Sequence, residues 1–241
     1  MRSFRTRSSA TEMMDDVSIV DERLIGALDN IKASNRWLGA CQSITRPLAR
    51  WHRHTQRDSV SVLDIGTGRA DLPADLVRWG QQHGLKVEVT AIDNNDVTID
   101  YAAGQLDQEL PTDLRSQIHL AVVDALHLPY DDDAFDIVLA AQFLHHFEDD
   151  TIVGLLADMQ RIAADGILVS DLHRHRLAYA GIWTIGHVLP VSPMFRMDGP
   201  ISVRKGFKRA DMEHYAEAAH LPNATIRWQW AFRWMLTTLP V

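Results

Sequence analysis

The run VLDIGTGRAD at residues 62–71 constrains the fold of this chain more than any other feature. Residues 59–63 are rich in β-branched and apolar side chains, two glycines end that run, and a helix-compatible stretch covers residues 70–83, so the pattern predicts a strand, a tight turn and a helix. Gly66 and Gly68 permit positive φ angles and close approach of a ligand, and the helix N-terminus offers free N–H donors. The turn therefore predicts a nucleotide or nucleoside site, with a purely structural turn as the alternative.

Two acids in this run bear on which ligand fits. A dinucleotide-binding turn has the pattern G-x-G-x-x-G, and its third glycine packs the helix against the strand beside the pyrophosphate. This chain has Asp71 at that position, so a carboxylate would face two phosphates. Asp64 precedes the first glycine, and an acid there suits a ligand with a cationic end. The two acids thus favour a cationic nucleoside over a dinucleotide.

Length and composition limit the remaining possibilities. The 241 residues suffice for one large α/β domain with a good core. Hydrophobic residues make up 46% and charged residues 23%, which is ordinary for a globular protein. The net charge of −8 argues against nucleic acid as a partner, and the single Cys41 excludes an intrachain disulfide and argues against a cysteine metal site. Without an apolar leader or a membrane-length run, we expect a cytoplasmic protein.

The order of predicted elements indicates the fold class. Strands are predicted near residues 59–63, 86–92, 117–123, 135–141 and 166–170, with helices near 71–82, 97–110 and 149–164 between them. This alternation predicts a mainly parallel, doubly wound α/β sheet with right-handed crossovers. Ligands of such sheets bind beyond the carboxyl ends of the strands. A helix near residues 210–220 and two closely linked strands, 224–230 and 232–239, complete the chain.

Three further segments define the domain organisation. We expect residues 1–20 to be a loose tail and residues 21–56 to form an N-terminal helical cap, which either covers a sheet edge or closes over a substrate. The main domain is expected over residues 57–241. Within it, residues 172–208 read as an apolar insertion after the fifth strand, with a helix near 174–189 and then a loop that contains three prolines.

Acids also end the second and third predicted strands. Asp93 lies 25 residues beyond Gly68 (93 − 68), where a carboxylate can accept both hydroxyls of a ribose. Asp124 holds the equivalent place on the third strand. Each acid alone has a structural explanation as a turn cap. Three acids at consecutive strand ends, counting Asp64, favour an adenosine-containing ligand.

These motifs resemble those of the class I S-adenosylmethionine-dependent methyltransferases. Residues 64–70 match the pattern D/E-x-G-x-G-x-G, with Ala70 in place of the last glycine, and residues 124–130, DALHLPY, followed by AFDIV, are similar to the ubiquinone and menaquinone C-methyltransferases. The resemblance covers roughly residues 60–171. It implies a Rossmann-like, seven-stranded sheet whose last strand is inserted antiparallel, and S-adenosylmethionine as cofactor. In that family the Asp124 position takes the adenine amino group, and the next backbone N–H meets the ring. The residues expected to bind the cofactor are Asp64, Gly66, Thr67, Gly68, Asp93, Asn94, Asp124, Ala125 and Gln142.

The end of the fourth strand carries the acceptor-side candidates. His145 in the stretch QFLHHFEDD aligns with the histidine that serves as general base in plant-type phenolic O-methyltransferases, and His146 replaces the acid that follows it there. Both are expected to be catalytic. Asp171, after the fifth strand, is expected either to cap the next helix and pair with an arginine or to bind a polar substrate group. The residues expected to contact the substrate are Trp37, His173, Tyr179 and Trp183, and no metal is expected.

The resemblance implies methyl transfer from S-adenosylmethionine to a small, hydrophobic, aromatic hydroxylated metabolite, with O-methylation favoured over C-methylation. Two other classes remain open: an NAD-dependent oxidoreductase and a non-catalytic protein that binds an adenosine ligand. A small-molecule substrate is expected, with no nucleic acid or membrane as partner. The sequence leaves open the acceptor, the methylated atom and the oligomeric state.

Overall fold

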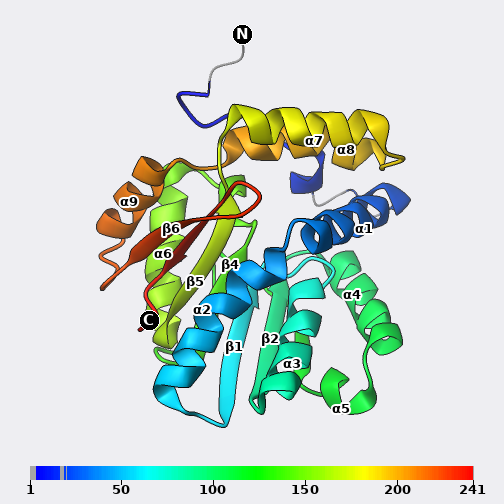
Figure 1. Cartoon of the computed structure of the whole chain (residues 1–241). Coiled ribbons are helices and arrows are strands. Elements are labelled where there is room, and N and C mark those ends of the chain that lie inside the picture. Colours follow the sequence, from blue (N-terminus) through cyan, green and yellow to red (C-terminus); the bar gives the residue numbers. More distant parts are fainter. Residues whose placement is uncertain (1–3, 17–18, 20, 241) are drawn as a thin grey trace.

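Figure 1 shows a computed structural model of the chain, which describes residues 4–16, 19 and 21–240. A seven-stranded sheet in the order β3-β2-β1-β4-β5-β7-β6 runs through its centre. The strands are β1 Ser59–Ile65, β2 Lys86–Asp93, β3 Ile118–Val122, β4 Phe135–Ala141, β5 Ala163–Leu172, β6 Thr225–Gln229 and β7 Arg233–Thr237.

The direction of the strands confirms the predicted fold class. Strands β1 to β5 are parallel, and β7 is inserted antiparallel between β5 and β6. In register, Leu168 of β5 faces Thr237 of β7, and Ile226 of β6 faces Leu236. The reversal of strand order between β1 and β4 opens a crevice at the carboxyl ends of the strands, where ligands of such sheets bind.

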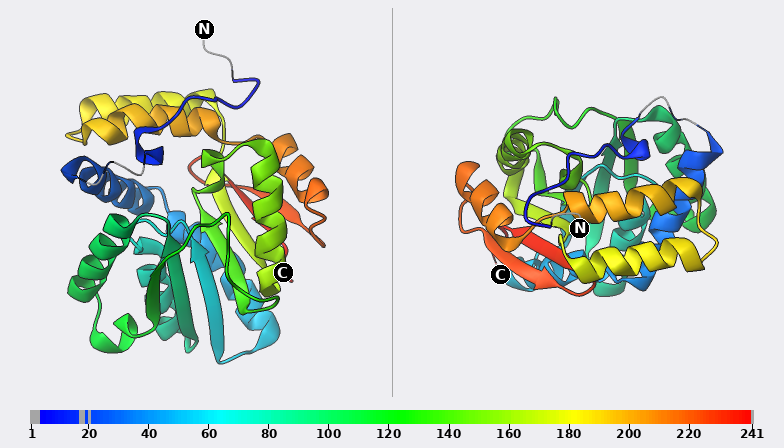
Figure 2. Two further views of the ribbon diagram at one scale, coloured as in Figure 1. Left: turned by 180° about the vertical axis from the view of Figure 1, so that it is seen from behind. Right: turned by 90° about the horizontal axis from the view of Figure 1, so that it is seen from above.

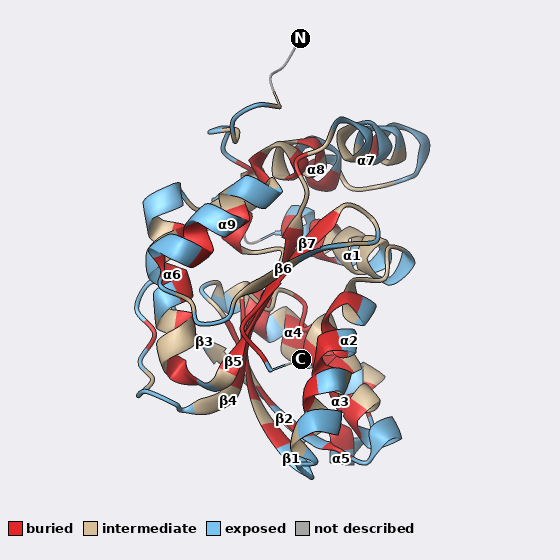
Figure 3. Ribbon diagram, turned by 60° about the vertical axis from the view of Figure 1, so that its left-hand side comes forward, coloured by how far each residue is buried: buried red, intermediate tan, exposed pale blue. Residues whose placement is uncertain are grey.

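Helices cover both faces of the sheet (Figures 1 and 2). Along β1, Val62 belongs to the core beneath α2, α3, α4 and α5, whereas Leu63 belongs to the core beneath α6 and α9, because successive strand residues point to opposite faces. Figure 3 shows this buried centre in red. The helices of the two faces are α2 Ala40–Thr55, α3 Asp71–His83, α4 Asp96–Glu109, α5 Thr112–Arg115, α6 Asp149–Ile162 and α9 Arg209–Ala218.

Three more helices lie across the carboxyl-terminal edge of the sheet. These are α1 Glu22–Trp37, α7 Arg176–Val188 and α8 Pro193–Lys205, and α8 packs against both α1 and α7. The predicted loop after residue 189 is wrong over residues 193–205, which form α8. Ser192 caps this helix by accepting a hydrogen bond from the N–H of Phe195. Pro193 stands at the first helical position, where a backbone N–H has no partner within the helix, so proline loses no hydrogen bond there.

The amino-terminal segment differs from the predicted loose tail. Within residues 4–16, a short 3-10 helix, η1 Met13–Asp15, is held against α8, because the Asp198 carboxylate accepts the backbone N–H groups of Met13 and Met14. Glu12 is consequently buried. Tertiary hydrogen bonds thus order a segment whose composition predicts no element. The rest of the predicted tail, at residues 1–3, 17–18 and 20, lies outside the described residues.

The predicted helical region before β1 is present as two helices. The chain turns between α1 and α2 at Gly39, whose φ of 67° lies in the left-handed region. None of the helices in the described part of the chain combines the length and the apolar character that crossing a bilayer requires.

Candidate active site

A single large cavity of about 1580 Å³ lies at the carboxyl ends of the strands. The glycine turn after β1 and the end of β2 line one part of it. Apolar residues of α7 and α8 and the amino-terminal segment line another part, and the loop after β4 lies between them. A typical ligand pocket is about 300–1,000 Å³, so this cavity has room for two small molecules side by side.

The glycine turn has the backbone that its sequence predicts. Gly66 and Gly68 have φ angles of +70° and +54°, and the N–H groups of Gly66 and Thr67 both bond to the carbonyl of Ile92 on β2. A Cβ atom on Gly66 would lie 2.2 Å from the ring of Phe143. Position 66 therefore requires glycine, both because of its positive φ angle and because the loop after β4 packs closely against it.

Asp64 is an unusual acid because it is buried at the end of β1, with only 2% of its surface exposed. Burial, followed by repulsion from Asp93, raises the pKa of its carboxyl to about 7. No lysine or arginine of the described residues forms an ion pair with it. A buried carboxyl that lacks a cationic partner and lines a cavity is suited to a ligand with a positive end.

Asp93 lies beside Asp64 at the end of β2. Its Oδ2 accepts the N–H of Gly68 at 3.0 Å, and its Oδ1 accepts the N–H of Asn95 at 3.2 Å, so the carboxylate ties the glycine turn to the second strand. Burial raises the pKa of Asp93, and these backbone donors partly offset the effect. Asp93, Asn94 and Thr67 all line the cavity, as the cofactor prediction requires.

Gln142 also lines the cavity, at the end of β4. Its backbone has a φ of 53°, and its side-chain amide donates to Asn35 of α1 at 2.6 Å. Asn35 in turn accepts from Arg233 of β7 at 3.3 Å. These contacts fix α1 to the centre of the sheet, so the N-terminal helices form one wall of the site.

Asp124 and Ala125 are the two predicted cofactor residues that the cavity does not reach. Asp124 is exposed, and both of its carboxylate oxygens have hydrogen-bond partners in the same turn. Its Oδ1 accepts the N–H of Leu126 at 2.9 Å, and its Oδ2 lies 2.9 Å from Nδ1 of His127. The structure therefore shows an Asx-type turn at this position. A role of Asp124 and Ala125 in binding adenine stays a prediction.

His145 lies at the bottom of the cavity, on a short 3-10 helix, η2 Leu144–His146. Its Nδ1 is 2.8 Å from Oδ1 of Asp171 on β5, and its backbone N–H donates to Oδ2 of the same carboxylate at 3.3 Å. Both side chains are buried. Burial lowers the pKa of His145, but the charges of Asp171 and Glu12 outweigh burial and leave this pKa above its usual value. The buried Asp171 carboxylate thus favours the protonated form of this ring. Catalysis by His145 and His146 stays a prediction.

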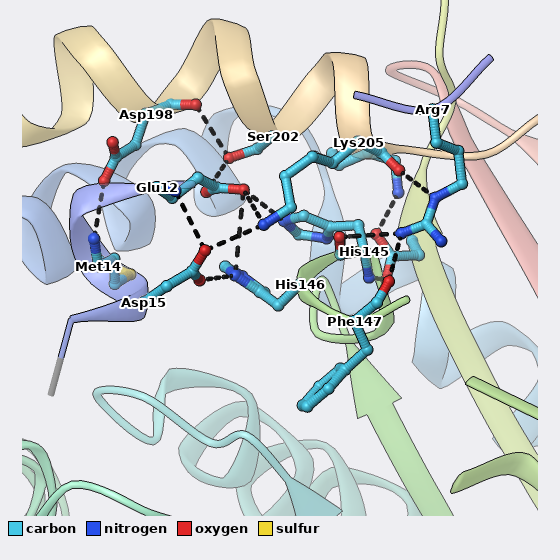
Figure 4. Close-up of polar contacts among 12 residues, drawn as sticks. Arg7, Glu12, Met14, Asp15, His145, His146, Phe147, Asp198, Ser202 and Lys205 are labelled. Carbon is cyan, nitrogen blue, oxygen red and sulfur yellow. Dashed lines mark hydrogen bonds and ion pairs between the residues drawn. The ribbon is translucent and has the colours of Figure 1, made fainter. Parts of the chain in front are cut away.

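The amino-terminal segment adds an acidic pair to the two histidines (Figure 4). Nδ1 of His146 lies 2.5 Å from Oδ1 of Asp15, and Oε1 of Glu12 lies 3.9 Å from Nε2 of His145 and 4.0 Å from Nδ1 of His146. Burial raises the pKa of Asp15, but its contacts with His146 and Lys205 outweigh burial and bring the pKa well below its usual value.

Helix α8 supplies the remaining polar groups of this cluster. Nζ of Lys205 lies 3.0 Å from Oδ2 of Asp15 and 3.3 Å from Oε1 of Glu12, and the hydroxyl of Ser202 donates to Oε2 of Glu12 at 2.5 Å. We call Glu12, Asp15, His145, His146 and Lys205 the polar cluster. It joins the amino-terminal segment, the loop after β4 and α8 across the cavity (Figure 4).

Arg7 fastens the same three parts from outside the cluster. Its guanidinium donates to the carbonyls of Lys205, His145 and Phe147 at 2.8, 3.0 and 2.8 Å. It also forms an ion pair of 2.6 Å with Asp149 at the start of α6. One side chain thus holds the backbone beside both ends of the polar cluster.

The four residues predicted to contact the substrate lie outside the lining of the cavity. Trp37 is 87% exposed, and none of Trp37, His173, Tyr179 and Trp183 lines the cavity. Helix α7 instead turns the positions 178, 181, 182 and 185 toward it, which share one helical face. Tyr179 packs edge-on against Phe4, and Trp183 stacks on His187. Contact with a substrate by these four stays a prediction.

The sequence reasoning missed Glu12, Asp15, Ser202 and Lys205, and it did not pair Asp171 with His145. Glu12 and Asp15 stand in a segment without hydrophobic periodicity, and Lys205 stands in a short basic run, so neither pattern indicates a site. A local hint is that three acids, Glu12, Asp15 and Asp16, follow the three arginines of residues 2–7. Asp171 does not cap α7, because His175 does so by accepting the N–H of Leu177.

Comparison with known proteins agrees with this geometry. Residues 62–166 match the family described as "Methyltransferase domain". Over the whole fold, the chain is similar to a protein of Methanococcus maripaludis assigned to the S-adenosylmethionine-dependent methyltransferases, with a TM-score of 0.64, 13% identity and 98% of each chain covered. Residues 62–166 are therefore a methyltransferase domain, and the whole chain has the fold of S-adenosylmethionine-dependent methyltransferases. The motif-based prediction of this family is thereby confirmed.

Two further similar proteins are informative. The demethylmenaquinone methyltransferase of Roseiflexus sp. (strain RS-1) is 31% identical over 126 residues, which are 51% of this chain and 48% of the relative. The chain thus spans about half the length of that curated relative. The magnesium protoporphyrin IX methyltransferase of Synechocystis PCC 6803, solved with bound S-adenosylmethionine, has a TM-score of 0.56 at 13% identity, with 88% of this chain and 85% of that chain covered.

S-adenosylmethionine is the cofactor of the family, and the residues around the glycine turn of this chain fit it. Gly66 and Gly68 leave the backbone open to a ligand, and Asp93 stands where a ribose would be held. The buried, cation-free carboxyl of Asp64 suits the positively charged methionine end. A pyrophosphate would instead bring negative charge toward three carboxylates, those of Asp64, Asp71 and Asp93.

Proposed function

We propose that this protein transfers the methyl group of S-adenosylmethionine to a small hydrophobic acceptor, an aromatic hydroxylated compound methylated on oxygen. The observation that carries this proposal is the continuity of the cavity. One space of about 1580 Å³ joins the glycine turn after β1 to a wall of apolar side chains on α7 and α8 and to the polar cluster. A cofactor and an acceptor can therefore lie next to each other without leaving the protein.

The cofactor end of the cavity is polar and the acceptor end is largely apolar. Ala178, Ile182, Ile185, Met194 and Phe195 line the acceptor end. A flat apolar ring buries its surface well against such a wall, whereas a peptide or nucleic acid would need a longer, open groove. A small aromatic acceptor is therefore the class of substrate that this end supports best.

The polar cluster gives an acceptor its orientation. When bound, S-adenosylmethionine supplies a methyl group that is already activated by the positive charge on its sulfur. The protein's own task is to hold the acceptor atom in line with that group. Such orientation can lower the activation barrier by about 7 kcal/mol. Glu12, His145 and His146 offer hydrogen-bond partners for a hydroxyl at the edge of the apolar wall.

The test is transfer of radiolabelled methyl from S-adenosylmethionine to a panel of phenols, hydroxyquinones and aromatic amines. We expect a product from at least one phenol, with the label on oxygen, and none without the protein. Product only from the amines would contradict the choice of oxygen. S-adenosylhomocysteine binding with no product from the whole panel would instead favour a non-catalytic adenosine-binding protein. A cytoplasmic location and the absence of a nucleic-acid partner stay predictions.

A further inference from the structure

We propose that Glu12, His145 and His146 form a binding site for one divalent transition-metal ion, of the class that Zn²⁺ and Co²⁺ represent. One ligand atom from each of the three residues lies within 4.8 Å of the other two, and Glu12 and His145 are buried. Two imidazoles and one carboxylate on a single cavity wall are a common ligand set for such metals. No metal is expected from the sequence, because it shows no second clear cluster of ligands, and Glu12 stands more than 130 positions from the histidines.

The separation of the ligand atoms is close to that of a metal site. Oε1 of Glu12 lies 3.9 Å from Nε2 of His145 and 4.0 Å from the nearer nitrogen of His146. Ligands about 2.0–2.1 Å from a tetrahedral Zn²⁺ lie about 3.4 Å from one another. The two pairs that include Glu12 need to close by roughly 0.5 Å, and the two histidine nitrogens, which lie within 4.8 Å of each other, by up to about 1.4 Å.

The Glu12 carboxylate provides a second, independent observation. The residue is only 3% exposed, and its Oε1 has no hydrogen-bond partner among the described residues, whereas its Oε2 accepts from Ser202. An oxygen that carries negative charge and is buried without a hydrogen bond is costly unless a cation stands next to it. Oε1 points toward both imidazoles (Figure 4), so the cation would lie between the three side chains.

His145 is held as metal ligands usually are. Nδ1 of His145 is bonded to Asp171 at 2.8 Å, and His146 is bonded to Asp15 at 2.5 Å. A carboxylate on one ring nitrogen fixes the orientation of the ring and makes the other nitrogen a better ligand. For His145 that other nitrogen, Nε2, is the atom that faces Glu12. In His146 the nitrogen nearer to Glu12, Nδ1, is also the one bonded to Asp15, so a metal would bind this nitrogen in place of that bond.

Lys205 competes with a metal ion for the Glu12 carboxylate, but its contacts leave Glu12 able to bind a metal. Nζ lies 3.0 Å from Asp15 but 3.3 Å from Oε1 of Glu12, so its shorter contact is to a carboxylate outside the three ligands. Lys205 can remain on Asp15 while Glu12 turns its free oxygen to the metal. With Glu12, Asp15 and Asp171 on one side and Lys205 on the other, the cluster retains excess negative charge, which favours a divalent ion.

The inference deepens the proposed function, on which its catalytic use rests. A metal at this place would bind an acceptor hydroxyl and lower its pKa, because a divalent ion acts as a Lewis acid. His145 would then be a ligand and would not be free to accept a proton.

The test measures metal binding by the full-length protein without any acceptor. The protein is stripped with a chelator and then titrated with ZnCl₂ by calorimetry and with CoCl₂ by visible absorption. We expect one tight equivalent of Zn²⁺ and visible cobalt absorption of the kind given by four- or five-coordinate sites. Glu12→Gln keeps the size of the side chain and should weaken binding of both metals at least tenfold. His145→Gln should do the same.

Two controls separate this site from other causes. Glu148→Gln removes a nearby glutamate that lines the cavity but offers no ligand, and it should bind Zn²⁺ as the parent does. S-adenosylhomocysteine should bind the Glu12→Gln protein within threefold of the parent, so that loss of metal is not loss of the cofactor site. The proposal is overturned if the parent binds no stoichiometric Zn²⁺ or Co²⁺, or if Glu12→Gln binds them unchanged. In either case Lys205 alone neutralises Glu12, and the proposed methyl transfer is unaffected.

Discussion

The imidazole of His145 and the carboxylate of Asp171 form a buried pair, with Nδ1 and Oδ1 2.8 Å apart. Asp171 is fully buried and also accepts the N–H of Leu172 at 2.7 Å. Removing one partner of such a pair leaves the other charge without compensation. We expect Asp171→Ala to lower the free energy of unfolding by about 3–5 kcal/mol, measured by urea denaturation at pH 6. Asp171→Asn, which keeps a hydrogen-bond acceptor, should cost clearly less.

The same pair makes stability depend on pH in a defined window. The pKa of Asp171 is lowered, since attraction to His145 outweighs burial, so its contribution is present above the ordinary value of 3.8 and is lost below it. The pKa of His145 is raised, so its contribution is present below 6.5 and is lost as the pH rises through the folded value. The parent should therefore lose stability above pH 6.5 more steeply than Asp171→Asn, and equal slopes in the two proteins would contradict this.

Asp64 should titrate near neutrality, and its ionisation should also lower stability as the pH rises. Burial raises its pKa from 3.8 to about 7, so its ionisation destabilises the cofactor-free protein as the pH rises between these values. This shift corresponds to at most about 4 kcal/mol. We expect Asp64→Asn to stabilise the free protein at pH 8 and to leave stability at pH 4 almost unchanged, measured by thermal unfolding.

The same substitution should have the reverse effect on the cofactor. Asp64→Asn removes the charge that faces the methionine end, so S-adenosylhomocysteine should bind at least tenfold more weakly at pH 8. A variant that is both more stable and unimpaired in binding would mean that Asp64 is only a structural acid.

Gly66 should tolerate no side chain, and Gly84 supplies a matched control. Both residues have a φ of +70°, but a Cβ on Gly66 would lie 2.2 Å from the Phe143 ring, whereas nothing lies within 4 Å of a Cβ on Gly84. Gly84→Ala should cost about 1–2 kcal/mol for its backbone angle alone. Gly66→Ala should cost about 1–3 kcal/mol more for overpacking, together with a large loss of cofactor affinity. Equal costs at the two positions in chemical denaturation would exclude the close packing on Phe143.

Arg7 should be required for the amino-terminal segment to stay in place. Its guanidinium satisfies three backbone carbonyls that surround the polar cluster, and the side chain is largely buried. Arg7→Ala should lower the free energy of unfolding by about 2 kcal/mol or more, since hydrogen bonds to a charged donor are each worth about 1.5–3 kcal/mol. Arg7→Lys keeps the charge but not the planar set of donors, and should recover less than half of the loss.

Cofactor binding by Arg7→Ala distinguishes a local role of Arg7 in the amino-terminal segment from a general loss of folding. Arg7 touches no residue of the glycine turn, so Arg7→Ala should bind S-adenosylhomocysteine within threefold of the parent at a temperature where both are folded. Loss of that binding would show that the amino-terminal segment shapes the cofactor end as well.

Local sequence patterns were sufficient for the parallel part of the sheet and for the backbone of the glycine turn, whereas the antiparallel insertion of β7 was expected only from the family resemblance. The alternation of apolar strands with amphipathic helices predicts parallel order, and the positive φ angles at Gly66 and Gly68 follow from the glycines themselves. Asp64 and Asp93 lie together because the carboxyl ends of neighbouring parallel strands meet at one edge. These features depend on short-range chemistry and on a regular topology.

The acceptor end depends on contacts between distant segments. Glu12 reaches His145 only because Asp198 holds η1 and Arg7 holds the chain before it, and neither contact leaves a periodic pattern in the sequence. Helix α8 contains Pro200 and Gly199, so its propensity favours a loop, and packing against α1 and α7 overrides this preference. The polar cluster is thus a product of tertiary structure.

The most direct test of the account is calorimetric titration of the parent and of Asp93→Ala with S-adenosylhomocysteine and, separately, with NAD. The account predicts one site for S-adenosylhomocysteine in the parent, binding at least tenfold weaker in Asp93→Ala, and no measurable binding of NAD. Binding of NAD by the parent, with no heat from S-adenosylhomocysteine, would contradict it.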